Sequence, residues 1–571
     1  MNNYCPVTIS KSNCENCFRC VRECEVKAIK FNLSQPQITS EKCVACGNCI
    51  DNCPSGFISI DSHATKVQRA IKNNSIIIAS LSPGWITEFK NIEPYRMIEA
   101  LRLLGFTHVS ETSIGATLVK IETAKILGES GNFFISNTCP AVTKLIKTYY
   151  PELTKNIIEV VPPAVAHARY LKQKYGSAAV VVTIDSCIAT KTYTNSENSD
   201  IYASLTFEEL RDLMTSEGVE FDFIPGNKTY TFEPFESQAD NQYILPRGVY
   251  NHHFLSEFQL SKTTIHNFSG ISRIKNILSA LLKEDKPKNS YIELFACKEG
   301  CMYGAGSLDS LNFITKRMKM SEYEKSEKPY NNNTFPIVYL QEKHKMSPIN
   351  TKISQEEISD ALETLFIERG KEPKNCGGCG YIDCYSFAIA LAEDNTKAEM
   401  CVYYQKQLAQ NKFTMLLSKM PSGVAVVGSD MKIIEANRNF ATMLGADSMM
   451  IYDANPGMAG ADITRLLTFH IMVSDVLKSG INSVEKDVQI KDKMIKLTVF
   501  TLQKHNMVCI LARNMFLSDV RNDEILSRTR KVINDNLETV QQIAYLLGEN
   551  ASKTEAVLNS IIESQTVENE R

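Results

Sequence analysis

The chain has 571 residues and a formal net charge of −3, so it is long enough for several domains and nearly balanced in charge. This balance, and the lack of a dense basic run, argue against a nucleic-acid-binding surface. No stretch reaches the roughly 20 uncharged apolar residues needed to cross a bilayer, and the first residues, MNNYCPVTISK, lack the charged and apolar regions of a secretory signal. We therefore expect a cytoplasmic protein without a membrane span.

Cysteine is the most informative residue type, because all but two of the 18 cysteines fall into four groups along the chain. The spacing within the groups is typical of iron-sulfur ligands rather than of disulfides. Reduced thiolates and oxygen-labile clusters also suit a reducing cytoplasm. The two remaining cysteines, Cys5 and Cys509, are expected to be packed thiols. The pattern predicts a multidomain electron-transfer protein.

The first two cysteine groups each read C-x2-C-x2-C-x3-C. This spacing lets three thiolates of a tight loop reach one cubane, while the fourth is carried to the neighbouring cluster. Zinc sites use paired C-x2-4-C arms instead, which makes zinc, like a disulfide framework, the weaker alternative. Residues 1–66 resemble two-cluster bacterial ferredoxins, and we call them the ferredoxin region. Its predicted ligands are Cys14, Cys17, Cys20 and Cys53 for one [4Fe-4S] cluster, and Cys43, Cys46, Cys49 and Cys24 for the other.

From about residue 70, short β-branched runs alternate with helical periodicity, as expected of a parallel sheet with covering helices. Open parallel sheets place their sites outside the carboxyl ends of the strands, so cysteines that follow strands could meet at one point. Each cysteine alone could instead be a small buried apolar residue. The predicted strands are Ile76–Ser80, Phe133–Ile135, Ala179–Ile184 and Tyr291–Phe295. The cysteines that would hold a third cubane are Cys139, Cys187, Cys297 and Cys301.

Three segments of this central part resemble the signatures of [FeFe] hydrogenases: NTCPAVTKLIKTYYPEL, DSCIATK and ELFACKEGCMYGAG. The resemblance implies a two-lobed α/β H-cluster domain over residues 70–368, which we call the central domain. It also implies that the four cysteines named above hold the cubane of the H-cluster. The thiolate of Cys301 would also bridge to a diiron subcluster with CO, cyanide and azadithiolate, the unit that interconverts dihydrogen and protons in that family.

The sequence also departs from the hydrogenase pattern. Thr138 stands where the family has a proton-relaying cysteine, and it is, with Cys301, our catalytic candidate. The family's lysine three positions after the second ligand is here Thr190, followed by Lys191. Glu122 is the only residue of the acidic relay that we can place. Such changes resemble the divergent, sensory hydrogenases and, more distantly, the Narf-like assembly proteins, which have no diiron site.

Residues 369–410, which we call the small domain, contain the fourth cysteine group. They resemble the small [4Fe-4S] domain of Rnf-type electron-transfer subunits and corrinoid iron-sulfur proteins. Three nearby glycines favour close approach of the backbone to a cluster, but four thiolates would also suit zinc, and that alternative stays open. The predicted ligands are Cys376, Cys379, Cys384 and Cys401.

Residues 411–516 resemble a PAS domain. The segment Leu416–Gly445 reads strand, turn, strand and helix, with Asn437 as the predicted helix cap, and later antiparallel strands follow. PAS domains bind small ligands or pair with one another. His470 and His505 are expected to be surface or core residues rather than haem ligands.

Residues 517–571 show a coarse heptad register, which predicts a C-terminal helix and a possible coiled coil or homodimer. A helix packed on the PAS domain would give the same stripe. No kinase or phosphatase motif follows, so any output would pass to a separate signalling protein. We assign no role to residues 227–288, and expect an exposed loop at Met320–Asn333.

These features favour a hydrogenase-like protein that senses dihydrogen or redox state through an H-cluster with slow turnover, and signals through its PAS domain. One alternative is a non-catalytic iron-sulfur relay or assembly protein with four cubanes and no diiron site. Another is a moderately active hydrogenase that exchanges electrons with ferredoxin. The expected partners are ferredoxin or another electron carrier, dihydrogen and protons.

Overall fold

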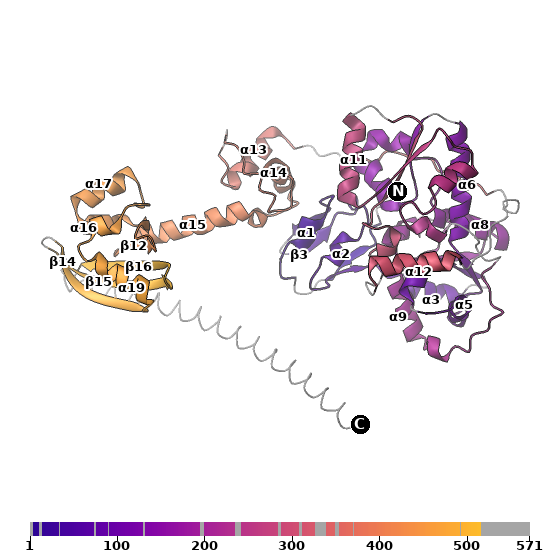
Figure 1. Cartoon of the computed structure of the whole chain (residues 1–571), viewed down its shortest axis with the longest axis horizontal. Coiled ribbons are helices and arrows are strands. Elements are labelled where there is room, and N and C mark those ends of the chain that lie inside the picture. The colour runs from indigo at the N-terminus through magenta and orange to yellow at the C-terminus, as the bar shows by residue number, and fades with distance from the viewer. Residues whose placement is uncertain are drawn as a thin grey trace, which may run out of the picture. The chain divides into compact units, whose positions relative to one another are not determined.

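The computed structural model describes residues 4–10, 14–32, 35–73, 76–89, 91–129, 132–194, 199–233, 241–283, 287–307, 311–325, 338–348, 353–368, 371–490 and 493–514. The chain divides into two compact units, residues 1–405 and 406–571 (Figure 1). The predicted C-terminal helix at 517–571 lies outside the described residues. None of the described helices is both long and apolar enough to cross a membrane.

The ferredoxin region is built from two small antiparallel strand pairs and two short helices. Strand β1 (Val7–Ile9) pairs with β4 (Ile58–Ile60), which closes the region end to end. The second pair joins β2 (Ile29–Asn32) to β3 (Gln35–Ile38). Each helix lies within one cysteine group: α1 covers Arg19–Glu23, and α2 covers Asn48–Asp51.

The first lobe of the central domain is a four-stranded parallel sheet in the order β6-β5-β8-β9. Alternate residues of β5 face opposite sides: Ile77 packs with α3, α5 and α9, whereas Ile78 packs with α6 and α8. Helices α6 and α8 lie side by side (Figure 1). The elements of this lobe are α3 (Ala64–Asn73), β5 (Ile77–Leu81), α4 (Trp85–Glu88), α5 (Pro94–Leu103), β6 (His108–Glu111), α6 (Ser113–Glu129), α8 (Pro163–Tyr175), β8 (Val180–Ile184), β9 (Ala203–Leu205) and α9 (Phe207–Ser216).

The second lobe is a three-stranded parallel sheet in the order β10-β11-β7. Most of its buried residues form one cluster with the helices α7 and α11, whereas Tyr291 and Phe254 pack with α6 and α8 of the first lobe. The elements are β7 (Phe133–Ile135), α7 (Pro140–Tyr149), α10 (His252–Glu257), β10 (Thr264–Ser269), α11 (Ile271–Lys283) and β11 (Ser290–Phe295).

The two lobes confirm the predicted α/β class and all four predicted strands, each within one residue at either end. The sequence reading missed β6, β9 and β10, and it did not show that β5 and β8 pair in one sheet while β7 and β11 pair in the other. Strand β10 and helix α11 occupy most of the second half of the segment 227–288, to which no role had been assigned.

The prediction of an exposed loop at Met320–Asn333 is wrong for the first part of that segment. Helix α12 (Phe313–Lys325) runs through residue 325, and Met320 is fully buried in an apolar cluster with Ile244, Leu245 and Met302. The many charged residues of this helix had masked its buried side. Residues 326–333 lie outside the described part of the chain.

The small domain contains the helix α14 (Cys384–Ala392), which packs against α13 (Gln355–Thr364), the last helix before this domain. Ser354 caps α13 and forms a capping box with Glu357, and Asp383 caps α14. Helix α15 (Val402–Lys419) begins at the residue that follows Cys401. One predicted ligand thus opens α14, and another immediately precedes α15.

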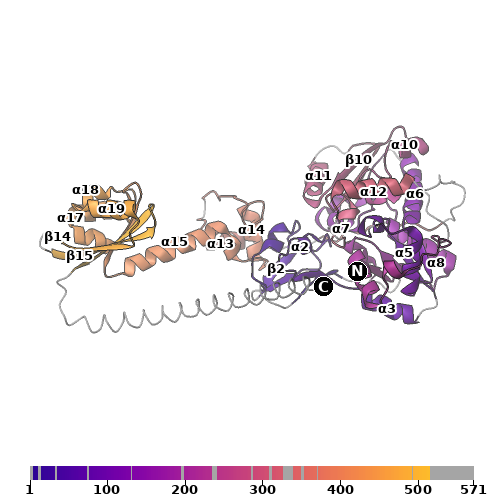
Figure 2. The same cartoon turned by 60° about the horizontal axis from the view of Figure 1, so that its bottom comes forward.

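The second unit contains the PAS domain, a five-stranded antiparallel sheet in the order β13-β12-β16-β15-β14. Asn437 caps α16 by accepting the Phe440 N–H, as predicted. The helices pack against one face of the sheet (Figure 2). The elements are β12 (Gly423–Gly428), β13 (Ile433–Ala436), α16 (Arg438–Leu444), α17 (Ala446–Ala454), α18 (Ile463–Leu466), α19 (His470–Ser479), β14 (Ser483–Ile490), β15 (Lys493–Gln503) and β16 (Met507–Asn514).

Candidate metal centre

Four cysteines from three distant parts of the central domain line one cavity. Cys139 follows β7 and precedes Pro140, the first residue of α7, a position at which proline favours a helix start. Cys187 follows β8, whereas Cys297 and Cys301 follow β11. The space in the cavity that the centre of a water molecule can reach is about 60 Å³. The thiols predicted to converge at strand ends therefore do converge, although their role as ligands stays a prediction.

The chemistry of these thiols fits a bound cluster. Burial raises the pKa of all four, that of Cys187 to about 12, and the other thiols of the set add to the effect at Cys301. Four buried thiolates would be unfavourable together in this cavity without positive charge between them. Iron supplies that charge, and four thiolates are the usual ligand set of a cubane. Among the described residues, no three His, Cys, Asp or Glu side chains are grouped closely enough to hold a single metal ion.

Several polar residues complete the wall of the cavity. Thr138 lines it beside Cys139, and Thr190 lines it from the other lobe. The Cys187 amide N–H donates to Asp185 Oδ1 at 2.6 Å, and Ser186 Oγ donates to the carbonyl of Cys301. Burial raises the pKa of Asp185 to about 7, although that N–H and the Thr190 hydroxyl act in the opposite direction. Asp185 and Ser186 thus fix the loops that carry two of the predicted ligands.

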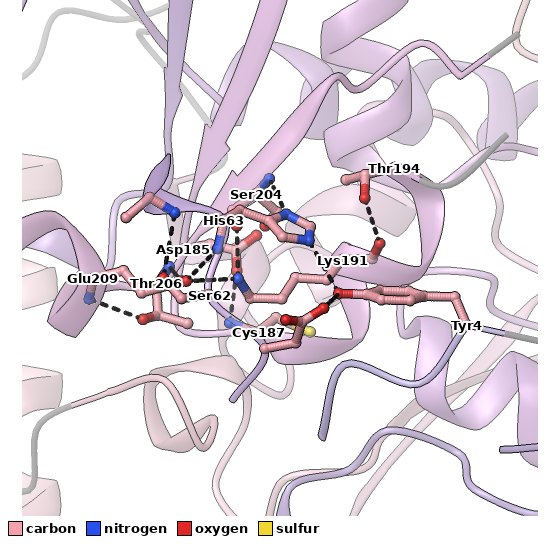
Figure 3. Close-up of polar contacts among 12 residues, drawn as sticks. Tyr4, Ser62, His63, Asp185, Cys187, Lys191, Thr194, Ser204, Thr206 and Glu209 are labelled. Atoms are coloured by element: carbon pink, nitrogen blue, oxygen red, sulfur yellow. Dashed lines mark hydrogen bonds and ion pairs between the residues drawn. The ribbon is translucent and has the colours of Figure 1, made fainter. Parts of the chain in front are cut away.

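Lys191 does not take the place of the family lysine at the cavity. Its ammonium group is fully buried and donates to Glu209 Oε2 at 2.8 Å and to the carbonyl of Ser204 at 2.9 Å (Figure 3). The loop Ile188–Thr194 is a 3-10 helix, in which neighbouring side chains point about 120° apart. A shift of one position therefore turns the lysine away, and Thr190 faces the cavity instead.

The carboxylate of Glu209 also connects the loop after Cys187 to residues near the start of the chain. Glu209 Oε1 accepts the His63 amide N–H at 2.8 Å, and the Ser204 amide N–H donates to His63 Nδ1 at 3.3 Å (Figure 3). His63 Nε2 lies 3.0 Å from the Tyr4 hydroxyl, which donates to Asp61 at 2.7 Å. Burial lowers the pKa of His63 to about 4, so the ring is neutral near pH 7. Sequence reasoning missed this network, because its members share no spacing.

Glu122, the residue placed in the acidic relay, does not line the cavity. Its side chain is 30% exposed on α6 and pairs with Lys125 at 3.0 Å. The next residue, Thr123, is the one that faces inward, and it contacts the buried hydroxyl of Tyr250. Tyr243 does line the cavity, where its hydroxyl hydrogen-bonds with Ser82, and no sequence motif had indicated it.

The ferredoxin cysteines lie close to one another, and their division into two ligand sets stays a prediction. The thiols of Cys14, Cys17 and Cys53 are close enough to Cys20 to raise its pKa, although burial is the larger cause. Those of Cys24, Cys43 and Cys46 act in the same way on Cys49. The first set we call the outer ferredoxin set, and the second the inner ferredoxin set.

The inner ferredoxin set is the one next to the central cavity. Cys46 lines that cavity, and its thiol acts on the pKa of Cys297. A Cβ atom on Gly47 would lie 2.2 Å from the Cβ of Ala305, so only glycine allows this approach. Cys5, which no spacing rule had selected, forms a side-chain hydrogen bond with Cys43 of this set.

The small-domain cysteines also gather, with Cys376 exposed and Cys379 and Cys401 buried. The thiols of Cys376 and Cys401 both act on the pKa of Cys384, which burial raises. This arrangement agrees with the predicted ligand set and leaves the choice between a cubane and zinc open.

The two PAS histidines each have a backbone partner. His470 Nδ1 lies 3.0 Å from the carbonyl of Leu467, and His505 Nδ1 lies 3.2 Å from that of Leu477. Cys509 is buried in β16, as expected of a packed thiol.

Residues 75–305 match the family model described as iron only hydrogenase large subunit, C-terminal domain. The central domain belongs to the iron-only hydrogenase family. Three further models match around this hydrogenase domain: a 4Fe-4S dicluster domain at 13–68, an Fe-S cluster at 373–403 and a PAS domain at 411–478. The chain is thus an iron-sulfur protein of hydrogenase type with a PAS domain.

Among known proteins, this hydrogenase-type chain is similar to the NADP-reducing hydrogenase subunit HndD of Solidesulfovibrio fructosivorans, with 24% identity over 216 residues. The match covers 32% of this chain and 37% of the length of that curated relative.

Two solved structures are also similar. A variant of the [FeFe]-hydrogenase HydA1 from Chlamydomonas reinhardtii is 15% identical, covering 49% of this chain and 91% of that one, with a TM-score of 0.37. The photoactive yellow protein domain of the sensor histidine kinase Ppr from Rhodospirillum centenum is 16% identical, covering 18% and 91%, with a TM-score of 0.15.

Proposed function

We propose that this protein senses dihydrogen or redox state with an H-cluster in its central domain and signals through its PAS domain. The observation that carries the proposal is the cavity lined by four convergent thiols with Thr138 among them. The thiols fit the cubane of an H-cluster. The hydroxyl of Thr138 suits slow rather than fast exchange of protons with the cofactor.

Cys139, Cys187, Cys297 and Cys301 would hold the cubane, and Cys301 would also carry the diiron subcluster. When bound, this group would supply the cleavage and formation of dihydrogen. The chain itself would position it, keep water out and deliver protons. The apolar wall and the two lobes that meet at the cavity serve the first two tasks.

Proton delivery is the task for which this chain is poorly equipped. The hydroxyl of Thr138 has a pKa far above that of a thiol, so it can pass a proton only along a chain of hydrogen bonds. Asp185 already accepts the Cys187 amide N–H and holds that loop. Glu122 pairs with Lys125 on a partly exposed helix face. Slow turnover follows, and slow turnover favours a sensor over a bulk catalyst.

The test is infrared spectroscopy of the full chain after maturation by hydrogenase-maturation factors. We expect bands of CO and cyanide bound to iron, which shift when dihydrogen is added. A matured protein with a complete set of cubanes but without these bands would contradict the proposal.

A non-catalytic iron-sulfur relay is the second candidate. It is favoured by Lys191, which is bonded to Glu209 and so is not free to contact a cofactor ligand. Iron counting separates the two, because four cubanes hold sixteen irons and the complete H-cluster raises the total to eighteen. The partners proposed for either function are ferredoxin or a similar electron carrier and a separate signalling protein that the PAS domain contacts in the cytoplasm.

A further inference from the structure

The small domain packs directly on the ferredoxin region. Buried residues of both parts form one apolar cluster, in which Val21 and Phe31 of the ferredoxin region lie with Tyr381 and Phe387 of the small domain. Predicted ligands of both parts belong to the same cluster. The two metal sites are therefore separated by packed protein rather than by solvent.

A largely buried ion pair fixes this contact. Lys42 Nζ lies 2.8 Å from Glu393 Oε2, and the two side chains are only 18% and 14% exposed. Lys42 precedes Cys43 of the inner ferredoxin set, and Glu393 follows α14, which begins at Cys384. The pair thus joins segments that carry predicted ligands on both sides.

The approach of the two backbones is close. A Cβ atom on Gly380 would lie 2.6 Å from Cα of Arg22, so a larger residue would push the parts away from each other. Gly380 follows the predicted ligand Cys379. Arg22 lies in α1, midway in sequence between Cys20 of the outer set and Cys24 of the inner set. Glycine here allows one ligand loop to rest on the other domain.

Lys27 lies between the two ligand sets. Its ammonium group donates to the carbonyls of Val21 and Arg22 at 3.1 and 2.8 Å, and lies 4.9 Å from the centre of the Tyr381 ring. Burial lowers the pKa of Lys27, whereas the thiols of Cys24 and Cys379 both act to raise it. One cation is therefore close to a predicted ligand of each cluster.

The inner ferredoxin set also faces the central domain. Cys46 lines the central cavity, and the hydroxyl of Tyr149 donates to the carbonyls of Val26 and Lys42 at 3.2 and 2.8 Å. The thiols of Cys24 and Cys43 act on the pKa of Tyr149, which burial raises. The inner set thus has the outer set, the central cavity and the small domain as neighbours.

We propose that the inner ferredoxin cluster is a branch point, from which electrons pass either to the outer cluster or directly to the small-domain cluster. The inference rests on the proposed function, because it needs a cubane rather than zinc in the small domain. Each step would transfer one electron: a cluster held by the inner ferredoxin set would be oxidised, one held by the small-domain cysteines would be reduced, and no proton or bond would be involved.

Lys27 stabilises the reduced state of both clusters. A reduced cubane carries one more negative charge than an oxidised one, and a buried ammonium group nearby favours it on either side. A cation shared in this way keeps the two potentials matched, which allows electrons to move in both directions. The small-domain cluster would then report the redox state of the central domain at the start of α15.

The test uses electron paramagnetic resonance of the full chain, reconstituted and fully reduced without oxygen. Two neighbouring reduced clusters should show the split signals of magnetically interacting spins. We expect Lys42→Glu and Glu393→Lys each to remove the splitting that involves the small-domain cluster, and the double variant Lys42→Glu/Glu393→Lys to restore it. Rescue by the exchanged pair would show that the contact, and not loss of folding, is responsible.

A second variant tests the shared cation. Lys27→Met keeps the apolar stem and removes the charge, so the midpoint potentials of the inner and the small-domain clusters should both fall. Lys30→Met, on β2 of the same region, is the matched control and should shift neither. A fall in only one potential would contradict the branch point.

The outcomes separate this inference from the proposed function. A wild-type small domain that binds zinc, or gives no cluster signal, would contradict the predicted cluster set and this inference with it. A normal small-domain signal without splitting would overturn the branch point alone. Infrared bands of the H-cluster are independent of either result.

Discussion

The side chain at position 138 is the main difference in proton supply between this chain and a fast hydrogenase. Thr138 lines the cavity beside Cys139, with a hydroxyl that does not ionise near neutral pH. The neighbouring polar groups already have partners, such as the amide N–H that Asp185 accepts. The rate of proton supply should therefore depend on this residue more than on any other in the cavity wall.

Thr138→Cys should raise dihydrogen evolution by the matured protein at least about tenfold, because a thiol can give up and regain a proton near neutral pH. The measurement is dihydrogen production with a strong reductant, normalised to the infrared bands of the cofactor. Thr138→Ser retains the hydroxyl and should leave the rate unchanged. Equal rates for the Cys and Ser variants would refute the role given to this position.

Glu293 makes stability depend on pH. The residue is buried in β11, and burial raises its pKa to about 8, so the folded state holds its proton more tightly than the unfolded chain does. The stabilisation that comes from this tighter proton binding is complete at pH values below the pKa of Glu293 in the unfolded chain. It is lost as pH rises through about 8, the pKa in the folded state. Glu293→Gln should stabilise the central domain at pH 9 by up to roughly 4 kcal/mol relative to wild type.

Anaerobic thermal unfolding at pH 6 and pH 9 tests this expectation. The difference in Tm between the two conditions should shrink in Glu293→Gln. Glu152→Gln, at an exposed position of the 3-10 helix Pro151–Asn156 in the same domain, should leave the difference as it is in wild type. If both variants behave alike, the buried carboxyl is not the group responsible.

At the scale of the element, buried ion pairs hold the segments near the predicted ligands on neighbouring helices. Lys191 and Glu209 tie the 3-10 helix after Cys187 to α9. Lys316 of α12 pairs with Glu88 of α4. Lys316 also donates to the carbonyl of Met302, next to Cys301, at 3.1 Å. Both pairs therefore position backbone that carries predicted ligands.

Lys191→Met should destabilise the central domain by about 3 kcal/mol, because it leaves the carboxylate of Glu209 buried without its cation. Lys125→Met removes a lysine that is 63% exposed from its pair with Glu122, and should cost less than about 1 kcal/mol. Denaturant unfolding of both variants gives the comparison. Similar losses would mean that burial of the pair is not what matters.

The sequence supported the prediction of elements with strong local patterns. Strands such as β8, a run of β-branched residues, and the capped start of α16 at Asn437 were predictable for this reason. Strand β9 has only three residues, and β10, TIHNFS, mixes polar and apolar residues on both faces, so neither has a local signature. The pairing of strands into two sheets depends on contacts between distant residues, which periodicity does not record.

The same limit applies to the candidate site. Cysteines at strand ends indicated where the thiols would converge, because sheet geometry determines that edge. The direction of Lys191 depends on the 3-10 helix Ile188–Thr194, and the position of Tyr243 depends on a second 3-10 helix, Asn241–Ile244, from another part of the chain. Those details come only from the three-dimensional structure.

At the scale of the whole first unit, two glycines allow three metal-binding parts to approach one another. Gly47 brings the inner ferredoxin set to the central domain, and Gly380 brings the small domain to the ferredoxin region. The path between predicted clusters thus depends on the absence of two side chains. The rate of electron transfer along this path should therefore fall when a single methyl group is added at either glycine.

Gly47→Ala should slow electron transfer between the ferredoxin region and the central domain, since the added Cβ would meet Ala305 at 2.2 Å. Gly56→Ala is a close control, because Gly56 also has a positive φ, of +64°, but nothing lies within 4 Å of its added Cβ. Freeze-quench spectroscopy after rapid reduction, on samples of equal iron content, measures the rates. The expectation fails if the two variants slow transfer equally.

Helix α15 begins at the residue after Cys401, and the amide N–H of Tyr404 donates to the Cys401 sulfur at 3.4 Å. Cys376 of the same set is exposed. A cubane held there would be open to attack by molecular oxygen, and its loss would free the first turn of the helix. We therefore expect exposure to air to lower the helicity of the first turn of α15. Oxygen would then act on the chain through Cys401, the same residue through which we propose that the redox state of the cluster is reported.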